Sequence, residues 1–151
     1  MRLLKVVILC GLFASAAVFA QERRTNPAAL PPVNGYSHVV VAPPGQRVVI
    51  SGQVALDAKG NLVGAGDFEK QCVQVHENIK AALASLGLTF KDVIRTDNYI
   101  TDRKYLPLLR KVRSSYLPTE QPPASTLLLV DGLFRPDLLV EVSVEAVIPA
   151  K

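Results

Sequence analysis

The sequence contains no tryptophan, one methionine, two histidines and two cysteines. A zinc site in a protein takes histidine or cysteine ligands that recur at short spacings. His38 has no second histidine or cysteine at such a spacing, and His76 has only Cys72, four residues before it. The neighbours Gln74, Glu77 and Asn78 predict a polar helix face around His76. We therefore expect no metal site.

Aromatic residues and phosphate-binding loops are also scarce. Phenylalanine and tyrosine make up 6% of the chain, which is few for the stacking platforms that bind single-stranded nucleic acid. The glycine-rich stretch 60–66 lacks the lysine and the serine or threonine of a P-loop. The only dense basic run is Arg110 to Arg113. We therefore expect no nucleic-acid partner.

The first 20 residues have the pattern of a secretory signal peptide. Arg2 and Lys5 precede an apolar run over residues 6–20, and the chain turns polar at Gln21. The run is shorter than the ~20 residues that a membrane-spanning helix needs, although a membrane anchor is the alternative. We expect cleavage after Ala20 and a periplasmic or secreted protein that is not held in a membrane. Cleavage lowers the formal net charge from +4 to +2, because it removes two basic residues and no acidic one.

Once Cys10 leaves with the signal, Cys72 is the only cysteine, so no internal disulfide is possible. Residues 21–34 are polar and proline-bearing, which predicts an extended lead-in. Residues 35–151 are long enough for one domain.

Two β-branched runs, 38–42 and 47–54, are separated by Pro-Pro-Gly-Gln, which predicts a β-hairpin.

From Asp67 the apolar residues recur every three or four positions, which predicts a helix that Gly87 ends. The predicted apolar face consists of Phe68, Cys72, Val75, Ile79, Leu83 and Leu86. Cys72 is therefore expected in the core.

The remaining chain predicts a strand over 92–101, a helix over 102–116 interrupted near Pro107, and strands over 126–130 and 138–147. The order β-β-α-β-α-β-β is an α+β layout with the helices packed on one face of a mixed or largely antiparallel sheet. Alternation in the last strand places Glu141 and Glu145 on one face, where carboxylates need water, a partner subunit or a ligand cleft.

Five strings occur in an order that resembles the Rid (YjgF) family over essentially the whole mature domain. They are Gly-Tyr-Ser-His at 35–38, Ile-Ser-Gly-Gln-Val at 50–54, the helix at 71–87, Pro-Ala-Ser-Thr at 123–126 and Val-Ser-Val-Glu-Ala at 142–146. The resemblance implies a chorismate-mutase-like fold, a homotrimer with clefts at the subunit interfaces, and imine or enamine deamination that gives a 2-oxo acid and ammonia without a cofactor.

The resemblance also implies roles for individual residues. Tyr36 would line the cleft, Ser51 and Gly52 would contact the small-molecule ligand, and Glu145 would hold the attacking water as the catalytic residue. In the family's deaminases, an arginine in a Pro-Ala-Arg-Ser/Thr motif grips the substrate carboxylate. Here that position is Ser125, followed by Thr126.

Without the arginine, transition-state binding of an anionic imino acid should weaken by about 10- to 100-fold or more, because a charge-assisted hydrogen bond contributes about 1.5–3 kcal/mol. Arg113 on the second helix would restore a positive charge from another direction, or would belong to a solvated face. The sequence therefore leaves open a divergent deaminase, a binder of a ligand without a carboxylate, a non-enzymatic holdase-like oligomer, and an RNA-cleaving relative.

Overall fold

The computed structural model describes residues 22–150, so the predicted signal peptide lies outside the described residues. Its centre is a four-stranded sheet in the order β3-β6-β4-β5. The strands are β3 (Gly45–Gln53), β4 (Val93–Ile100), β5 (Ala124–Leu129) and β6 (Val140–Pro149). β6 pairs antiparallel with β3 and β4, and β4 pairs parallel with β5, so the sheet is mixed as predicted.

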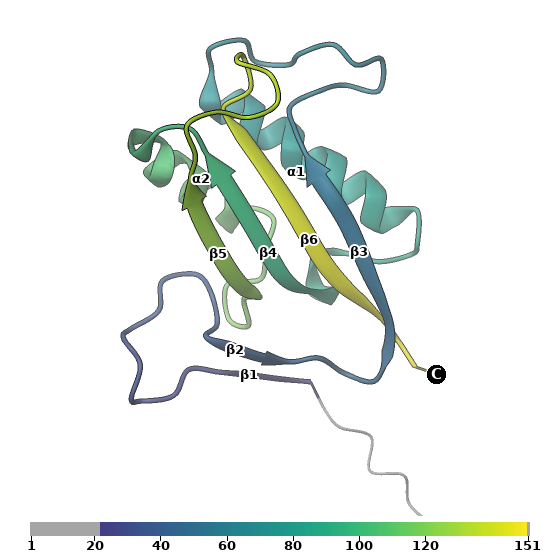
Figure 1. The fold of residues 1–151 in the computed structure, drawn as a ribbon. Helices are drawn as coiled ribbons and strands as arrows, with labels where there is room; N and C mark the ends of the chain where they lie inside the picture. The colour runs from purple at the N-terminus through teal and green to yellow at the C-terminus, as the bar shows by residue number, and fades with distance from the viewer. Residues whose placement is uncertain (1–21, 151) are drawn as a thin grey trace, which may run out of the picture.

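Two helices cover one face of this sheet and leave the other without a helix (Figure 1). α1 (Phe68–Ala84) packs against β3 and β6, and α2 (Leu106–Ser114) packs against α1. The 3-10 turns η1 (Phe90–Asp92) and η2 (Arg103–Tyr105) lead into β4 and α2. The predicted α+β architecture is confirmed. Within residues 22–150, no helix is long and apolar enough to cross a membrane.

α1 begins at a capping residue and ends at Ala84. The carboxylate of Asp67 accepts a hydrogen bond from the Lys70 backbone at 3.1 Å and caps the first turn. The helix ends at Ala84, so Leu86 lies beyond it and is 48% exposed, which corrects its predicted place on the apolar face. The rest of the predicted face, Cys72 included, is buried.

The predicted polar environment of His76 is wrong, because this side chain is 2% exposed. Its ring stacks on Tyr116 with centroids 4.9 Å apart. Nδ1 lies 2.8 Å from the carbonyl oxygen of Cys72, so the neutral ring donates to the turn before it. Burial lowers the pKa of His76, and the nearby charge of Arg113 lowers it further.

The predicted hairpin between residues 38–42 and 47–54 does not form. β2 (Val39–Val41) pairs antiparallel with β1 (Arg23–Thr25), and β3 pairs only with β6. β1 lies in residues 21–34, the segment expected to be an extended lead-in. Arg24 fixes it to the domain: the guanidinium donates to the carbonyls of Val93, at 3.0 Å, and Gln121, and its side chain is only 5% exposed.

Candidate functional site

Arg113, near the end of α2, reaches the strand position at which the sequence lacks an arginine. Its NH1 lies 3.4 Å from the hydroxyl oxygen of Ser125 on β5. Its NH2 lies 3.4 Å from the carbonyl oxygen of Asn34. The structure therefore brings together two of the predicted site residues, which are contributed by a helix and a strand.

A polar cluster beneath Ser125 holds its hydroxyl in place. Thr96 and Asn98, on the neighbouring strand β4, each lie 3.1 Å from the Ser125 oxygen and are almost fully buried. The amide of Asn98 also donates to the Thr126 carbonyl at 2.9 Å. Its oxygen Oδ1 is buried with no donor among the described residues. Buried amide oxygens are rarely left without a donor, so this cluster has capacity for one more hydrogen bond.

The segment that contains Tyr36 closes the cluster on the side away from β4. Ser37 forms an isolated parallel bridge with Ala124, the residue before Ser125. Gly35 has φ +71°, and a Cβ at this position would lie 2.7 Å from Arg113 NH2. Both facts favour glycine there. The Tyr36 ring is half-buried and meets His38 edge-on, with centroids 5.4 Å apart.

Arg113 retains free hydrogen-bonding capacity. Burial lowers its pKa, and the charge of Arg110 adds to the effect. Among residues 22–150, Arg113 forms no ion pair with a carboxylate. A half-buried guanidinium without a carboxylate partner can bind an anionic group of a ligand, and its planar fork suits a carboxylate.

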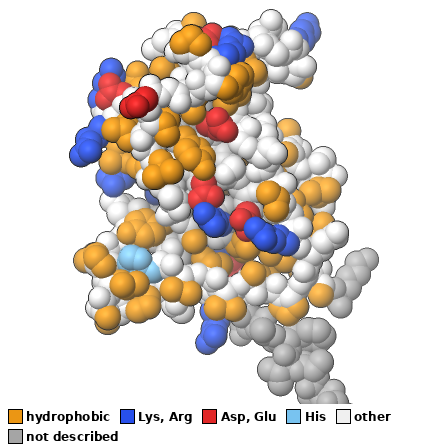
Figure 2. All heavy atoms as spheres, in the orientation of Figure 1, with side chains coloured by type: hydrophobic (Ala, Val, Ile, Leu, Met, Phe, Trp, Pro, Cys, Tyr) orange, Lys and Arg blue, Asp and Glu red, His pale blue; other side chains and the backbone are white. Residues whose placement is uncertain are grey.

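The sheet face without helices, called the open face below, carries the second group of predicted residues. Its charged and apolar side chains are interspersed (Figure 2). It is formed by side chains that alternate with the buried ones on β3, β4 and β6, namely Arg47, Val49, Arg95, Asp97, Tyr99, Glu141, Ser143 and Glu145.

Glu145 on the open face is held by a guanidinium. Arg47 contacts both carboxylate oxygens of Glu145, at 2.9 and 3.1 Å. The Arg47 side chain is 66% exposed, so solvent screens the pair and the arginine is free to leave it. Arg95, opposite Glu145 in the register, is instead paired with Asp97 at 3.0 Å.

Glu141 is a candidate site residue for which the sequence predicted no role. The alternation in the last strand predicted only that it shares a face with Glu145. A Cβ on Gly52 would lie 1.8 Å from Glu141 Oε1, so the carboxylate rests directly against this glycine. The pairing of β3 with β6 is irregular between Ile50 and Gln53, which leaves Ser51 and Gly52 exposed beside it. Within the described chain, Glu141 has no ion-pair partner.

A single chain does not bring all the predicted residues to one place. Ser125 pairs with the buried Thr96, so its side chain lies on the helix side of the sheet, whereas Glu145 lies on the open face. Thr126, the next residue along β5, is exposed and pairs with Asp97. The part of the chain that the structure describes has no cluster of three metal-ligating side chains.

Sequence comparison identifies relatives over most of the domain. Residues 26–148 match a family model described as Endoribonuclease L-PSP. A RutC family protein of Saccharolobus solfataricus is 36% identical over 115 residues, which cover 76% of this chain and 88% of the relative. The 3-aminoacrylate deaminase RutC of Acinetobacter baylyi is 32% identical over 64% of this chain and 75% of its own.

Solved structures show the same fold. A protein of the conserved Rid family from Yersinia pestis, YyfB, whose function is described as unknown, superposes with a TM-score of 0.78 and 32% identity. The match covers 84% of this chain and 98% of that protein. RidA from an Antarctic Psychrobacter superposes with a TM-score of 0.63 and 31% identity, covering 78% and 92% of the two chains.

Proposed function

Because the chain belongs to the Rid (YjgF) family, we propose that it is a deaminase of small imines or enamines that carry a carboxylate. One relative is a 3-aminoacrylate deaminase by name, and its substrate is an enamine with a carboxylate. The observation that carries the proposal is the position of Arg113, 3.4 Å from Ser125. A guanidinium from α2 thus stands beside the strand position where the family's deaminases have their arginine.

In the proposed reaction, Arg113 binds the substrate carboxylate and the buried Asn98–Ser125 cluster fixes the rim of the cleft. An enamine first gains a proton on carbon and loses one from nitrogen, which gives the imine. Water then adds to the carbon of the C=N bond, the nitrogen takes up protons, and the C–N bond breaks, so that a 2-imino acid gives a 2-oxo acid and ammonia. Glu145 orients this water and accepts its proton. For that, Arg47 must swing away from Glu145, which costs little because surface ion pairs contribute only about 0–1 kcal/mol.

The proposal includes a cleft shared between subunits. Arg113 and Glu145 of one chain lie on different sides of the sheet, so one substrate meets both kinds of group only if a second copy contributes one of them. We propose the homotrimer that the family resemblance implies, with Ser51, Gly52 and Thr126 near the cleft. Sedimentation equilibrium tests the trimer: a monomer at micromolar concentration would contradict it.

Export is a separate part of the proposal and rests on residues 1–20. We propose that a signal peptidase cuts after Ala20 and that the protein acts in a periplasm or outside the cell. The N-terminal residue of protein purified from an exporting host tests it. An N-terminus at Gln21 supports export, whereas an intact Met1 contradicts it.

RNA cleavage is the less favoured alternative despite the description of the family model. The open face carries Asp97, Glu141 and Glu145, and its two arginines are already paired with acidic side chains. A phosphodiester backbone is bound by unpaired basic groups, so this face would repel it.

Ammonia release tests the proposal. Enzymatically generated 2-iminopropionate and 2-aminoacrylate are the substrates, and an imine of similar size without a carboxylate is the matched control. We expect faster hydrolysis of the two anionic substrates than of the neutral control. Equal rates for all three would remove the role of Arg113, and binding without turnover would assign the protein to the non-enzymatic ligand binders.

A further inference from the structure

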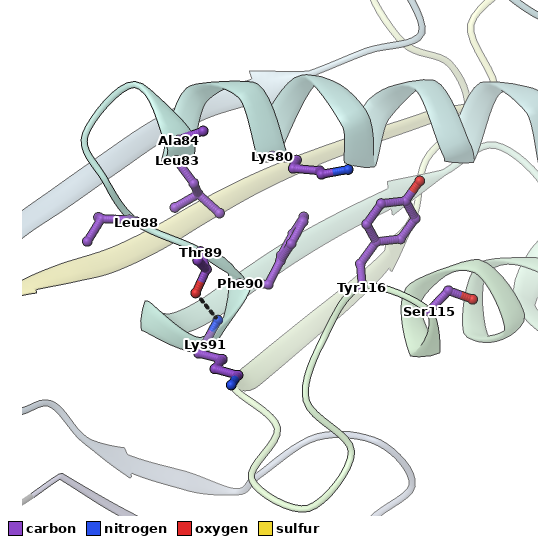
Figure 3. Close-up of a pocket in the computed structure, with 9 residues that line it drawn as sticks. All are labelled: Lys80, Leu83, Ala84, Leu88, Thr89, Phe90, Lys91, Ser115 and Tyr116. Carbon is purple, nitrogen blue, oxygen red and sulfur yellow. Dashed lines mark hydrogen bonds between the residues drawn. The ribbon is translucent and has the colours of Figure 1, made fainter.

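A groove on the helical side of the molecule lies apart from the open face. It runs between the C-terminal half of α1, the segment from Leu88 to Lys91, and Ser115–Tyr116 after α2 (Figure 3). Its volume is about 530 Å³, which is within the range of small-molecule sites. The predicted site residues do not line it.

The walls of the groove are apolar and firmly packed. Leu83, Leu88 and Phe90 are each at most 9% exposed. The Tyr116 ring is wedged between Phe90, 5.5 Å away, and His76. The Tyr116 hydroxyl points toward α1 (Figure 3) and donates to a Glu77 oxygen at 2.8 Å. Burial and this contact raise the pKa of Tyr116 to about 12, so its hydroxyl stays protonated.

The charged side chains that line the groove are both cationic. Lys80 and Lys91 approach it from different sides (Figure 3). Lys80 also contacts Glu77 at 3.3 Å. Lys91 has no carboxylate within ion-pair distance in the described part of the chain. The groove thus combines an apolar floor with a positive rim.

We propose that this groove binds an amphipathic monocarboxylate, an anion with an aliphatic body. The body displaces water from the accessible apolar surface of the groove, which includes Ala84 and the half-buried Tyr116 ring. Each methylene group that becomes buried favours binding through the hydrophobic effect. The carboxylate stays at the rim and pairs with Lys91. Charge complementarity selects an anion over a cation with the same body, and the scarcity of polar groups on the floor selects against sugars and nucleotides.

Calorimetric titration with decanoate tests the site, using protein purified from an exporting host. Decylamine, which has the same chain length and the opposite charge, is the ligand control. Ala84→Phe places a ring in the groove, and Ala81→Phe, on an exposed part of the same helix, is the matched protein control. We expect saturable decanoate binding that weakens at least 10-fold in Ala84→Phe and is unchanged in Ala81→Phe. Lys91→Gln should weaken it by about 2- to 5-fold, because Lys91 is exposed and an exposed ion pair contributes little.

Three results would overturn the proposal. The first is the absence of saturable decanoate binding, and the second is equal binding of decylamine. The third is equal decanoate affinity in Ala84→Phe and Ala81→Phe. If decanoate instead changes the oligomeric state in sedimentation runs, the groove is a contact between copies of the chain and the ligand site is rejected. A Lys80→Gln variant that loses more affinity than Lys91→Gln would reject the assignment of the carboxylate to Lys91.

Discussion

The guanidinium of Arg113 and the hydroxyl of Ser125 lie 3.4 Å apart, although the two residues belong to a helix and to an edge strand. The strand provides a small polar side chain supported by Asn98, and the helix provides the charge. A positive group can therefore reach this region of the sheet without an arginine on the strand itself.

Arg24 is predicted to contribute to stability far more than its neighbour does. Arg24→Ala removes the hydrogen bonds to the carbonyl groups of Val93 and Gln121 and should lower the free energy of unfolding by about 1–3 kcal/mol. Urea unfolding measures the change. Arg23→Ala, at an exposed position of the same short strand, is the control and should change stability by less than about 0.5 kcal/mol. Equal losses in the two variants would contradict the anchoring role.

Two glycines on β3 are predicted to respond differently to alanine. A Cβ at Gly45 would meet the backbone oxygen of Ile148 at 2.1 Å, and backbone in a paired strand cannot move aside cheaply. Gly45→Ala should cost about 1–3 kcal/mol of stability. A Cβ at Gly52 meets the movable carboxylate of Glu141, so Gly52→Ala should cost less. Thermal unfolding measures the stability of both variants. A larger loss of stability in Gly52→Ala than in Gly45→Ala would contradict the prediction.

Glu145 is predicted to carry the water-activating role, so Glu145→Gln should lower kcat/KM for 2-aminoacrylate about 100-fold or more. Glu141→Gln is the matched control, because it removes a carboxylate from the same face of the same strand. It should lower kcat/KM less than 10-fold, as judged by ammonia release. The reverse order would transfer the role to Glu141, whose carboxylate has no ion-pair partner among the described residues.

His76 is predicted to make the protein less stable in mild acid. Burial lowers its pKa in the folded state, so below the ordinary value of 6.5 the unfolded chain binds a proton that the folded chain excludes. Stability should therefore fall as the pH drops below about 6.5, with a slope from this one group of at most about 1.4 kcal/mol per pH unit. Unfolding of His76→Phe should lack this component, whereas Tyr116→Phe, which keeps the histidine, should retain it.

Local patterns predicted the elements well because their causes are local. The period of Phe68, Cys72 and Val75 follows directly from α1, and alternation correctly placed Glu141 and Glu145 on one face of β6. The burial of His76 could have been predicted, because His76 lies four residues after Cys72 and therefore on the same apolar face of the helix. Its polar neighbours in the sequence instead led to the prediction of a polar face. Leu86 was misassigned because the helix ends two residues before it.

Pairings between distant segments could not be derived from local patterns. The hairpin prediction failed because β3 finds its partner in β6, about a hundred residues away, and β2 pairs with a short polar strand before it. Arg113 stands in a basic run that is typical of a solvated helix face, and only the tertiary fold brings its side chain to Ser125. The contact of Glu141 with Gly52 depends in the same way on strand register.

The central claim is that Arg113 supplies the positive charge that binds the substrate carboxylate. Moving this charge from residue 113 to residue 125 tests the claim most directly. We would measure kcat/KM for 2-aminoacrylate in Arg113→Gln and in the double variant Arg113→Gln/Ser125→Arg, with Arg110→Gln as the control on an exposed position of the same helix. The account predicts a loss of about 10- to 100-fold in Arg113→Gln, recovery in the double variant, and no change in Arg110→Gln. Full activity in Arg113→Gln would contradict it.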